Sequence, residues 1–347
     1  MSAPLPTHFD NIFDLAKLPY FEVRGSELVL ADSKFGPAVD VHSHLSLTFL
    51  IKQRVNLLLE TETISHYLPD DRAIDFEVYQ NRNFTDADLK ALEADLGLGS
   101  LGTTGMRVTH TIPNLMREMR QVGVRASVLL PIEFPVLSRN AETWLEASRG
   151  REVTSEHDGL ICFGSVHPFD PRMEKRLDEQ VAMGARGVKI HPAVQLVRPD
   201  HDRAMKVYRA CGVRNLPVLI HCGPVDIEGA LGRRMSQLRH YERAVAECPE
   251  TTFFLGHSGA MQMEEGLRLA KRYDNVVLEM SGQSLPNVRR ILEEAPQDRI
   301  VYGSDWPFYH QAIGIAKVLM ATEGNEAQRK RVLHDNAARI LRLPARA

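Results

Sequence analysis

The sequence predicts a single α/β domain over residues 1–347, a (β/α)8 TIM barrel carrying an N-terminal extension and a large insertion after its first strand. The first observation is that apolar segments alternate with helical ones from residue 38 onward. These segments are apolar on both faces, as expected when helices cover one face and barrel packing fills the other. The second observation is the length of the chain, since such a barrel takes about 250 residues and leaves roughly 100 for an extension and insertions. We predict barrel strands and helices at 38–45 and 108–347.

Composition indicates a globular protein that acts on a small molecule. The chain has 347 residues, 44% hydrophobic and 25% charged, with a net charge of −3. A slightly negative net charge does not indicate a basic surface of the kind that binds nucleic acid or anionic membranes, so we expect neither as a partner. No leader-like or membrane-spanning run is present, and the four cysteines show no Cys-x-x-Cys spacing. We therefore expect a cytoplasmic protein, and the sequence predicts no oligomeric state.

The N-terminal extension, residues 1–37, contains two short apolar stretches that flank Arg24, Gly25 and Ser26. This pattern is typical of a β-hairpin. We expect the extension to cover the N-terminal side of the barrel.

The first barrel strand, Ala38–Leu45, runs into two histidines. Asp40, His42 and His44 alternate with apolar or small residues, so an extended chain places all three on one face. A His-x-His pair at a strand end is a common zinc-ligand arrangement. Two ligands are too few for a metal, so later segments must supply others.

An insertion at residues 46–107 separates the first strand from the second. It contains a polar helix that Thr85 opens, followed by Gly97, Gly99 and Gly102 in a Gly-x-Gly-x-x-Gly pattern. That pattern binds dinucleotides only between a strand and a helix. Here a helix precedes it, so we favour a flexible loop. Loops after barrel strands lie on the catalytic face, and we expect this one to form a lid over the substrate.

From residue 112 the strand and helix repeat becomes regular. One predicted helix begins with the pair Asp170 and Pro171, carries the apolar stripe Met173, Leu177 and Val181, and ends at Gly184. The seven further strands are predicted within Val124–Pro131, Leu160–Pro168, Gly187–Pro192, Val218–Gly223, Phe253–Gly259, Asn275–Gly282 and Arg299–Pro307.

Four of these strands carry a polar residue of metal-ligand or catalytic type near the end. They are Lys189, His221, His257 and Asp305, and the first three are 32 and 36 residues apart. Together with the His-x-His strand, this ordered set of five motifs resembles the amidohydrolase superfamily, most closely its amidohydrolase-2-like branch of metal-dependent TIM-barrel enzymes. The resemblance runs from about Ala38 to Leu341.

The resemblance implies a divalent metal held by imidazoles and a carboxylate. Its ligands would be His42, His44, His221 and Asp305, with zinc expected first and manganese or iron as alternatives. Asp305 would also move the proton of the attacking water. His257 would bind a second metal or act as a general base.

Lys189 leaves the number of ions open, at one or two. It could be carboxylated and bridge two metals. It could equally remain an ammonium that pairs with Asp305 or holds an anionic substrate group.

Three further residues are predicted near the substrate. His191 follows Lys189 on the same face and could contact substrate or make a structural hydrogen bond. Trp306 is expected in the pocket wall, and Glu279 could contact substrate or hold a metal ligand in place. The role of His310 is left open, and Asn336 is interpreted as structural.

These roles favour hydrolysis of an amide, lactone or ester-like bond in a small molecule. The same ligands also serve metal-dependent, non-oxidative decarboxylation of an aromatic or enol carboxylic acid, which is the alternative. A barrel that binds metal without catalysis is a further alternative. The presence of Asp305 argues against it, because a non-catalytic protein needs no proton-transfer acid.

Overall fold

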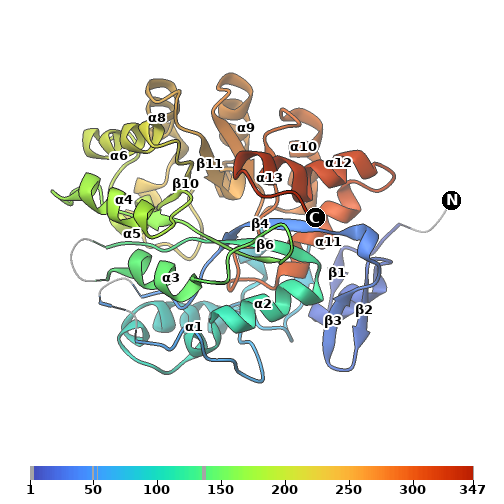
Figure 1. Cartoon of the computed structure of the whole chain (residues 1–347). Helices are drawn as coiled ribbons and strands as arrows, with labels where there is room; N and C mark the ends of the chain where they lie inside the picture. Colours follow the sequence, from blue (N-terminus) through green and yellow to red (C-terminus); the bar gives the residue numbers. More distant parts are fainter. Residues whose placement is uncertain (1–3, 49–50, 53, 135–137, 347) are drawn as a thin grey trace.

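The computed structural model describes residues 4–48, 51–52, 54–134 and 138–346 (Figure 1). Small parts of the predicted extension (1–3), insertion (49–50 and 53) and barrel (135–137 and 347) lie outside the described residues.

Eight parallel strand segments form the predicted barrel. They are β4 (Ala38–Ser43), β6 (Val124–Leu129), β7 (Gly159–Cys162) continued by β8 (Gly164–Ser165), β9 (Val188–Ile190), β10 (Val218–His221), β11 (Phe253–Gly256), β12 (Val276–Glu279) and β13 (Ile300–Val301). Neighbouring strands pair in chain order, in one run from β4 to β7 and another from β8 to β13. The first run continues into the second because β7 and β8 are separated only by Phe163.

The chain after β13 pairs with β4 and so links the last strand to the first. The amide of Val41 donates to the carbonyl of Tyr302 at 3.1 Å, and the amide of Asp305 donates to the carbonyl of His42 at 2.8 Å. The bridge between Ser43 and Trp306 continues the same parallel pairing. The predicted (β/α)8 barrel is confirmed.

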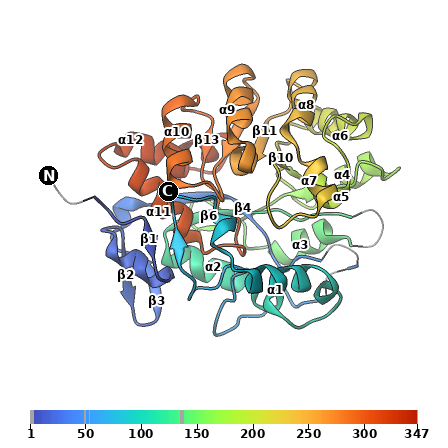
Figure 2. The same ribbon diagram turned by 180° about the vertical axis from the view of Figure 1, so that it is seen from behind.

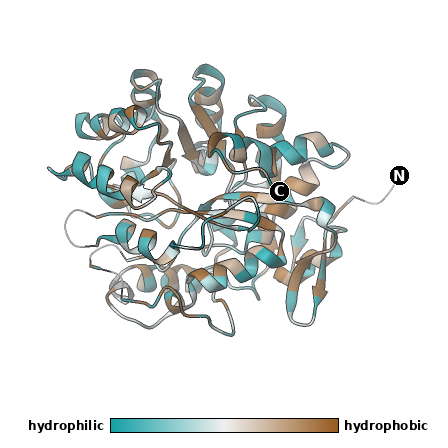
Figure 3. Cartoon of the chain, viewed as in Figure 1, coloured by the Kyte–Doolittle hydropathy of each residue, from teal (hydrophilic) through white to brown (hydrophobic). Residues whose placement is uncertain are grey.

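Helices surround the strands (Figures 1 and 2). Their apolar sides face the sheet and their hydrophilic sides face outward (Figure 3). The larger ones are α2 (Ile112–Gln121), α3 (Asn140–Ser148), α4 (Met173–Ala182), α6 (Asp202–Val213), α9 (Met263–Arg272), α10 (Leu285–Glu294) and α11 (Gln311–Ala321). Short helices are α5 (Pro192–Gln195), α7 (Ala230–Met235), α8 (Glu242–Glu247), α12 (Glu326–Lys330) and α13 (Asn336–Ile340). Among the described residues, none of the helices has both the length and the apolar character that crossing a bilayer requires.

Helix α4 differs in detail from its prediction. It begins at Met173, because the Asp170 carboxylate accepts the amide of Arg172 in a turn before the helix. Val181 is 40% exposed, and Gln180 takes the buried position. Successive steps of four residues drift around a helix of 3.6 residues per turn, so a third residue in the i, i+4 series leaves the buried face.

The N-terminal extension forms the predicted hairpin from β2 (Phe21–Arg24) and β3 (Glu27–Leu30). Gly25 makes its turn with a φ of +63°, a conformation that costs glycine little. The hairpin lies beside the start of β6, where Leu30 comes close to Gly123. The extension also reaches the insertion, because β1 (His8–Phe9) pairs with β5 (Ile74–Asp75).

The insertion has a buried polar core of its own. Its helix α1 (Asp86–Leu96) begins with the predicted cap, in which Thr85 and Asp88 exchange hydrogen bonds. The buried Arg107 lies 3.0 Å from Asp95 and donates to the carbonyl of Leu47 at 3.1 Å. These contacts tie the end of α1 to the chain that leaves β4. Gly97 and Gly102 flank a 3-10 helix at Leu98–Leu101 that contains Gly99 and directly follows α1. The pattern therefore lacks the preceding strand that a dinucleotide site requires.

Candidate active site

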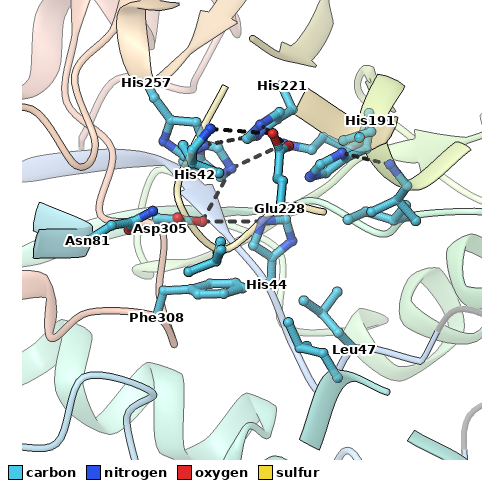
Figure 4. A pocket seen from close by; sticks show the side chains of 18 of the residues that line it. His42, His44, Leu47, Asn81, His191, His221, Glu228, His257, Asp305 and Phe308 are labelled. Carbon is cyan, nitrogen blue, oxygen red and sulfur yellow. Dashed lines mark hydrogen bonds and ion pairs between the residues drawn. The ribbon is translucent and has the colours of Figure 1, made fainter. Parts of the chain in front are cut away.

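A cavity of about 250 Å³ opens at the carboxyl end of the barrel strands (Figure 4). Strand ends supply polar groups to its floor, and the insertion supplies part of its wall. The polar floor contains His42, His44, Lys189, His221, His257 and Asp305. The insertion contributes Leu47, Tyr79, Asn81 and Leu96.

Three of the predicted ligands converge on the floor. Asp305 Oδ1 lies 3.5 Å from His42 Nε2 and 3.4 Å from His44 Nε2, and the three donors lie within 4.8 Å of one another. His44 Nδ1 lies 2.8 Å from the carbonyl oxygen of Leu130. That oxygen can only accept, so Nδ1 carries the hydrogen and Nε2 offers a lone pair. Two imidazoles and a carboxylate aimed at one point fit a divalent cation.

Glu279 lies behind this floor and contacts His42, the first of the predicted ligands. Its Oε2 lies 2.6 Å from His42 Nδ1 and accepts the amide of His257 at 2.9 Å. Burial raises the pKa of Glu279 to about 7. The side chain is buried and does not line the cavity. The predicted substrate contact of Glu279 is therefore corrected, and the structure places Glu279 against His42, a predicted metal ligand.

Lys189 lies against the same imidazole from the cavity side. Its Nζ is 3.1 Å from His42 Nε2, in a position to donate to the lone pair that a metal would use. Burial lowers the pKa of Lys189, and the negative charge of Asp305 opposes that shift.

Burial also keeps the cavity imidazoles neutral. It lowers the pKa of His42, His44 and His257 well below 6.5, and the nearby positive charge of Lys189 lowers each further. Neutral imidazoles are the form that binds metals or accepts protons.

His257 and Asp305 share an unusual backbone conformation. Their φ angles are +57° and +63°, in the left-handed region that residues other than glycine seldom occupy. His257 directly follows β11, Asp305 lies four residues after the end of β13, and both side chains line the cavity. Strain of this kind persists where the surrounding structure fixes a functional group.

His221 belongs to a neighbouring donor set. Its Nε2 lies 2.9 Å from Glu228 Oε1, and its ring stacks on that of His191 with centroids 4.1 Å apart. The donors of His191, His221 and Glu228 lie within 4.8 Å of one another. Among the described residues, no group of possible metal ligands with donor atoms within 4.8 Å of one another contains His42, His44 and His221 together. Sequence reasoning missed Glu228, although an acid in the loop after β10 could have drawn attention because that loop lies on the catalytic face.

Asp40 does not share the cavity with His42 and His44. Its carboxylate accepts the Ser304 hydroxyl at 2.6 Å, the Ser304 amide at 2.9 Å and the Gln311 side chain at 2.7 Å. It therefore anchors the chain that carries Asp305 to strand β4. The expectation of one shared face is wrong for Asp40, because the register of β4 shifts between Asp40 and Ser43.

Trp306 is buried and is not among the residues that line the cavity, so its predicted place in the wall is corrected. Its indole donates to Glu118 Oε2 at 3.1 Å, and Phe308 lines the cavity. His310, whose role was open, accepts the amide of Ala312 at the start of α11.

The carboxylate of Glu118 also holds a buried histidine, which predicts a pH dependence of stability. His66 lies 2.8 Å from Glu118 and 2.9 Å from Asp70. These two carboxylates outweigh burial and raise its pKa from 6.5 to about 10. A raised histidine pKa stabilises the fold fully below 6.5, and the stabilisation is lost as pH rises towards 10. We expect His66→Gln to lower the free energy of unfolding more at pH 6 than at pH 9.5, measured by urea unfolding. An equal loss at both pH values would show that His66 is not charged in the fold.

Comparison with known proteins identifies the family. The amidohydrolase family model Amidohydro_2 matches residues 138–343. No curated protein matches the chain.

Solved structures share the fold at low sequence identity. IDCase from Metarhizium anisopliae in its apo form is 17% identical, with a TM-score of 0.55 over 90% of this chain and 99% of its own. A probable 2-pyrone-4,6-dicarboxylic acid hydrolase from Acinetobacter baumannii, with citric acid bound, is 12% identical, with a TM-score of 0.55 over 89% of this chain and 100% of its own. The 5-carboxyvanillate decarboxylase of Novosphingobium aromaticivorans, complexed with manganese, is 18% identical, with a TM-score of 0.51 over 75% of this chain and 84% of its own.

The named structures therefore include a probable hydrolase and a decarboxylase, both sharing this fold. Because the family model spans more than half of the sequence, the chain belongs to the amidohydrolase family of TIM-barrel enzymes.

Proposed function

We propose that this protein is a metal-dependent hydrolase that cleaves an amide, lactone or ester-like bond in a small molecule. The observation that carries the proposal is the convergence of His42 Nε2, His44 Nε2 and Asp305 Oδ1 on the cavity floor. These residues would hold a divalent ion, with zinc expected first and manganese or iron as alternatives.

Other residues of the cavity floor would transfer protons and bind the substrate. A bound ion supplies Lewis acidity, which polarises a carbonyl and makes water more acidic. The Asp305 carboxylate can accept a proton from water at the floor and pass it to the leaving group. His257 offers a second neutral base, since its Nδ1 is held by the Ser281 hydroxyl at 2.7 Å. Lys189 can donate to the carbonyl oxygen of the substrate.

The cavity wall favours a compact and largely apolar substrate. Leu47, Leu96, Ile132 and Phe308 form part of it. Within the described part of the chain, the lining contains one basic side chain of the lysine or arginine type, Lys189. A molecule with several carboxylates would find too few positive partners and would lose hydration without compensation.

The same wall supports decarboxylation of an aromatic or enol acid as a second candidate. Lys189 can pair with one carboxylate, and the surrounding apolar groups exclude water from it. Moving a carboxylate out of water raises its free energy and so favours loss of carbon dioxide. The proton that replaces carbon dioxide would come from Asp305, because burial raises its pKa to about 7.

One set of assays tests both candidates. The chain is stripped with a chelator, reloaded with zinc or manganese, and given panels of esters, lactones, amides and aromatic monocarboxylic acids. We expect hydrolysis in the first three panels that depends on added metal, and a metal-dependent rise in melting temperature, because an ion that binds only the folded state stabilises it.

Carbon dioxide release without hydrolysis would replace the first candidate by the second. His44→Ala serves as the control, and it should lose both the activity and the metal-dependent shift in melting temperature. A melting temperature that does not respond to metal in the unaltered chain would contradict metal dependence.

A further inference from the structure

We infer that Lys317, a buried lysine of α11, is a positioning residue for substrate binding, because it holds the insertion segment 79–81 in the wall of the cavity. Lys317 itself is not among the described residues that line the cavity. The inference rests on the proposed function and deepens it, since it names residues that adapt the site to its substrate and the group that keeps them in place.

The side chain of Lys317 joins the insertion to the barrel. Its Nζ donates to Gln80 Oε1 at 2.8 Å and to the carbonyl of Gln283 at 2.7 Å. It also lies over the ring of Phe76, 5.3 Å from the centroid. Gln80 and Phe76 belong to the insertion, whereas Gln283 lies in the loop between β12 and α10. Lys317 therefore fixes the insertion to a loop at the carboxyl end of the barrel.

The burial of Lys317 lowers the stability of the fold rather than raising it. The residue is 3% exposed, and both of its hydrogen-bond acceptors are neutral. Burial lowers its pKa from 10.5 to about 7, although the negative charge of Asp75 opposes the shift. Enclosing a charge without a charged partner costs free energy, and two apolar side chains at positions 80 and 317 would be more stable. A polar group that breaks the local pattern in this way indicates a functional constraint.

Gln80 transmits this constraint to both of its neighbours. Its amide donates to the carbonyl of Gly282 at 2.8 Å, so its backbone as well as its side chain is bound to the barrel. Tyr79 and Asn81 line the cavity. Tyr79 packs on Gly282, where a Cβ atom would lie 2.8 Å from the tyrosine hydroxyl oxygen. A displacement of Gln80 must therefore move two residues of the wall.

Asn81 is the residue of this segment that can form a directional bond with substrate. The phenol of Tyr309 donates to Asn81 Oδ1, which leaves the amide nitrogen to donate elsewhere. Figure 4 shows Asn81 entering the cavity from the side on which Asp305 lies. The amide nitrogen can therefore donate to a carbonyl or carboxylate oxygen of a substrate at the floor.

The kinetics of Lys317→Met test the inference with whichever substrate the unaltered chain turns over. Methionine keeps an unbranched side chain but cannot donate to Gln80. We expect KM to rise about 3- to 10-fold, the scale of one lost hydrogen bond, while kcat and the metal dissociation constant change less than about 2-fold. A rise in KM at constant kcat identifies lost substrate binding rather than lost catalysis.

Further variants show whether Lys317 acts through Gln80 and Asn81. Gln80→Glu keeps an oxygen acceptor for Nζ and should leave KM unchanged. Gln80→Leu removes the acceptor and should raise KM as Lys317→Met does. In an Asn81→Ala background, Lys317→Met should raise KM by a smaller factor than it does alone, because the residue that it positions has lost its amide.

Thr322→Val is the matched control. Thr322 is buried at the end of α11, and its hydroxyl donates to the carbonyl of Val318 at 2.7 Å. The variant removes this hydrogen bond from the same helix and should leave KM unchanged. An unchanged KM in Lys317→Met, an equal rise in Thr322→Val, or the full effect of Lys317→Met in the Asn81→Ala background would each overturn the inference.

Hydrogen–deuterium exchange separates this inference from the proposed function, because it requires no substrate. Lys317→Met should exchange faster over residues 76–84 than the unaltered chain and Thr322→Val do. Unchanged exchange there would overturn the inference even in a chain that hydrolyses its substrate as proposed. Faster exchange together with carbon dioxide release in place of hydrolysis would replace the proposed reaction and keep the positioning role of Lys317. Circular dichroism verifies that every variant is folded.

Discussion

Replacement of Asp305 by asparagine is expected to reduce turnover by about 10²- to 10⁴-fold while the metal stays bound, on the scale typical of lost acid–base catalysis. The amide oxygen can still face His42 and His44, but an amide cannot accept the proton that a carboxylate accepts. Asparagine also tolerates the left-handed backbone at this position, since it visits that region more readily than most residues. The variant should therefore fold, and metal analysis beside steady-state kinetics measures both properties.

The Asp305→Ala variant separates ligation from proton transfer. It removes both functions, so we expect loss of metal together with loss of activity. If Asp305→Asn turned over substrate at the rate of the unaltered chain, Asp305 would be a ligand alone, and His257 would be the base. Reduced metal content in Asp305→Asn would instead assign most of its effect to ligation.

The barrel and the meeting point of its polar residues could be predicted from sequence, because both follow from strand order. Parallel strands in a closed sheet end at the same rim. A polar residue at the end of each apolar segment must therefore reach that rim, whatever the loops do. This reasoning placed His42, His44, His257 and Asp305 around one cavity, as the structure does.

The errors arose where strand alternation breaks down. The alternation of side chains along a strand assigns each residue to a face of the sheet only where the strand is regular. The register shift within β4 separates Asp40 from His42. The positive φ of Asp305 similarly redirects the chain, so Trp306 turns to Glu118 and Phe308 reaches the cavity.

The contact of Glu228 with His221 could not be predicted, for a different reason. Glu228 comes from a loop, and its approach to His221 depends on the hydrogen bonds of Val225 and Ser236, which no periodicity encodes. The number of residues between His221 and Glu228 shows only that they can meet. The contribution of Tyr79 and Asn81 to the cavity wall was missed for the same reason, since it depends on contacts within the insertion, such as that between Arg107 and Asp95, which no periodicity encodes.

Glu279→Gln provides the second large effect that we expect, on metal affinity. The carboxylate accepts from His42 Nδ1 at 2.6 Å, which orients the imidazole and increases the basicity of Nε2. Replacing such a carboxylate partner of a ligating histidine typically weakens metal binding about 10- to 100-fold. Glutamine has the same shape and can still accept from His42, but its amide nitrogen then replaces the oxygen that accepts the Ser281 amide. We therefore expect the variant to have a lower melting temperature than the unaltered chain when no metal is added, and circular dichroism verifies that it is folded.

Kinetics at saturating metal distinguish an orienting role of Glu279 from substrate contact. If Glu279 only orients His42, KM for the substrate stays unchanged once the metal site is saturated. The variant then differs from the unaltered chain in its metal dissociation constant, which a competition titration with a fluorescent chelator measures. If Glu279 contacts substrate, KM rises at every metal concentration while metal affinity is retained. The buried position of Glu279, outside the cavity lining and against His42, favours the first pattern, because a group that substrate cannot touch can act on the reaction only through the ligand that it holds.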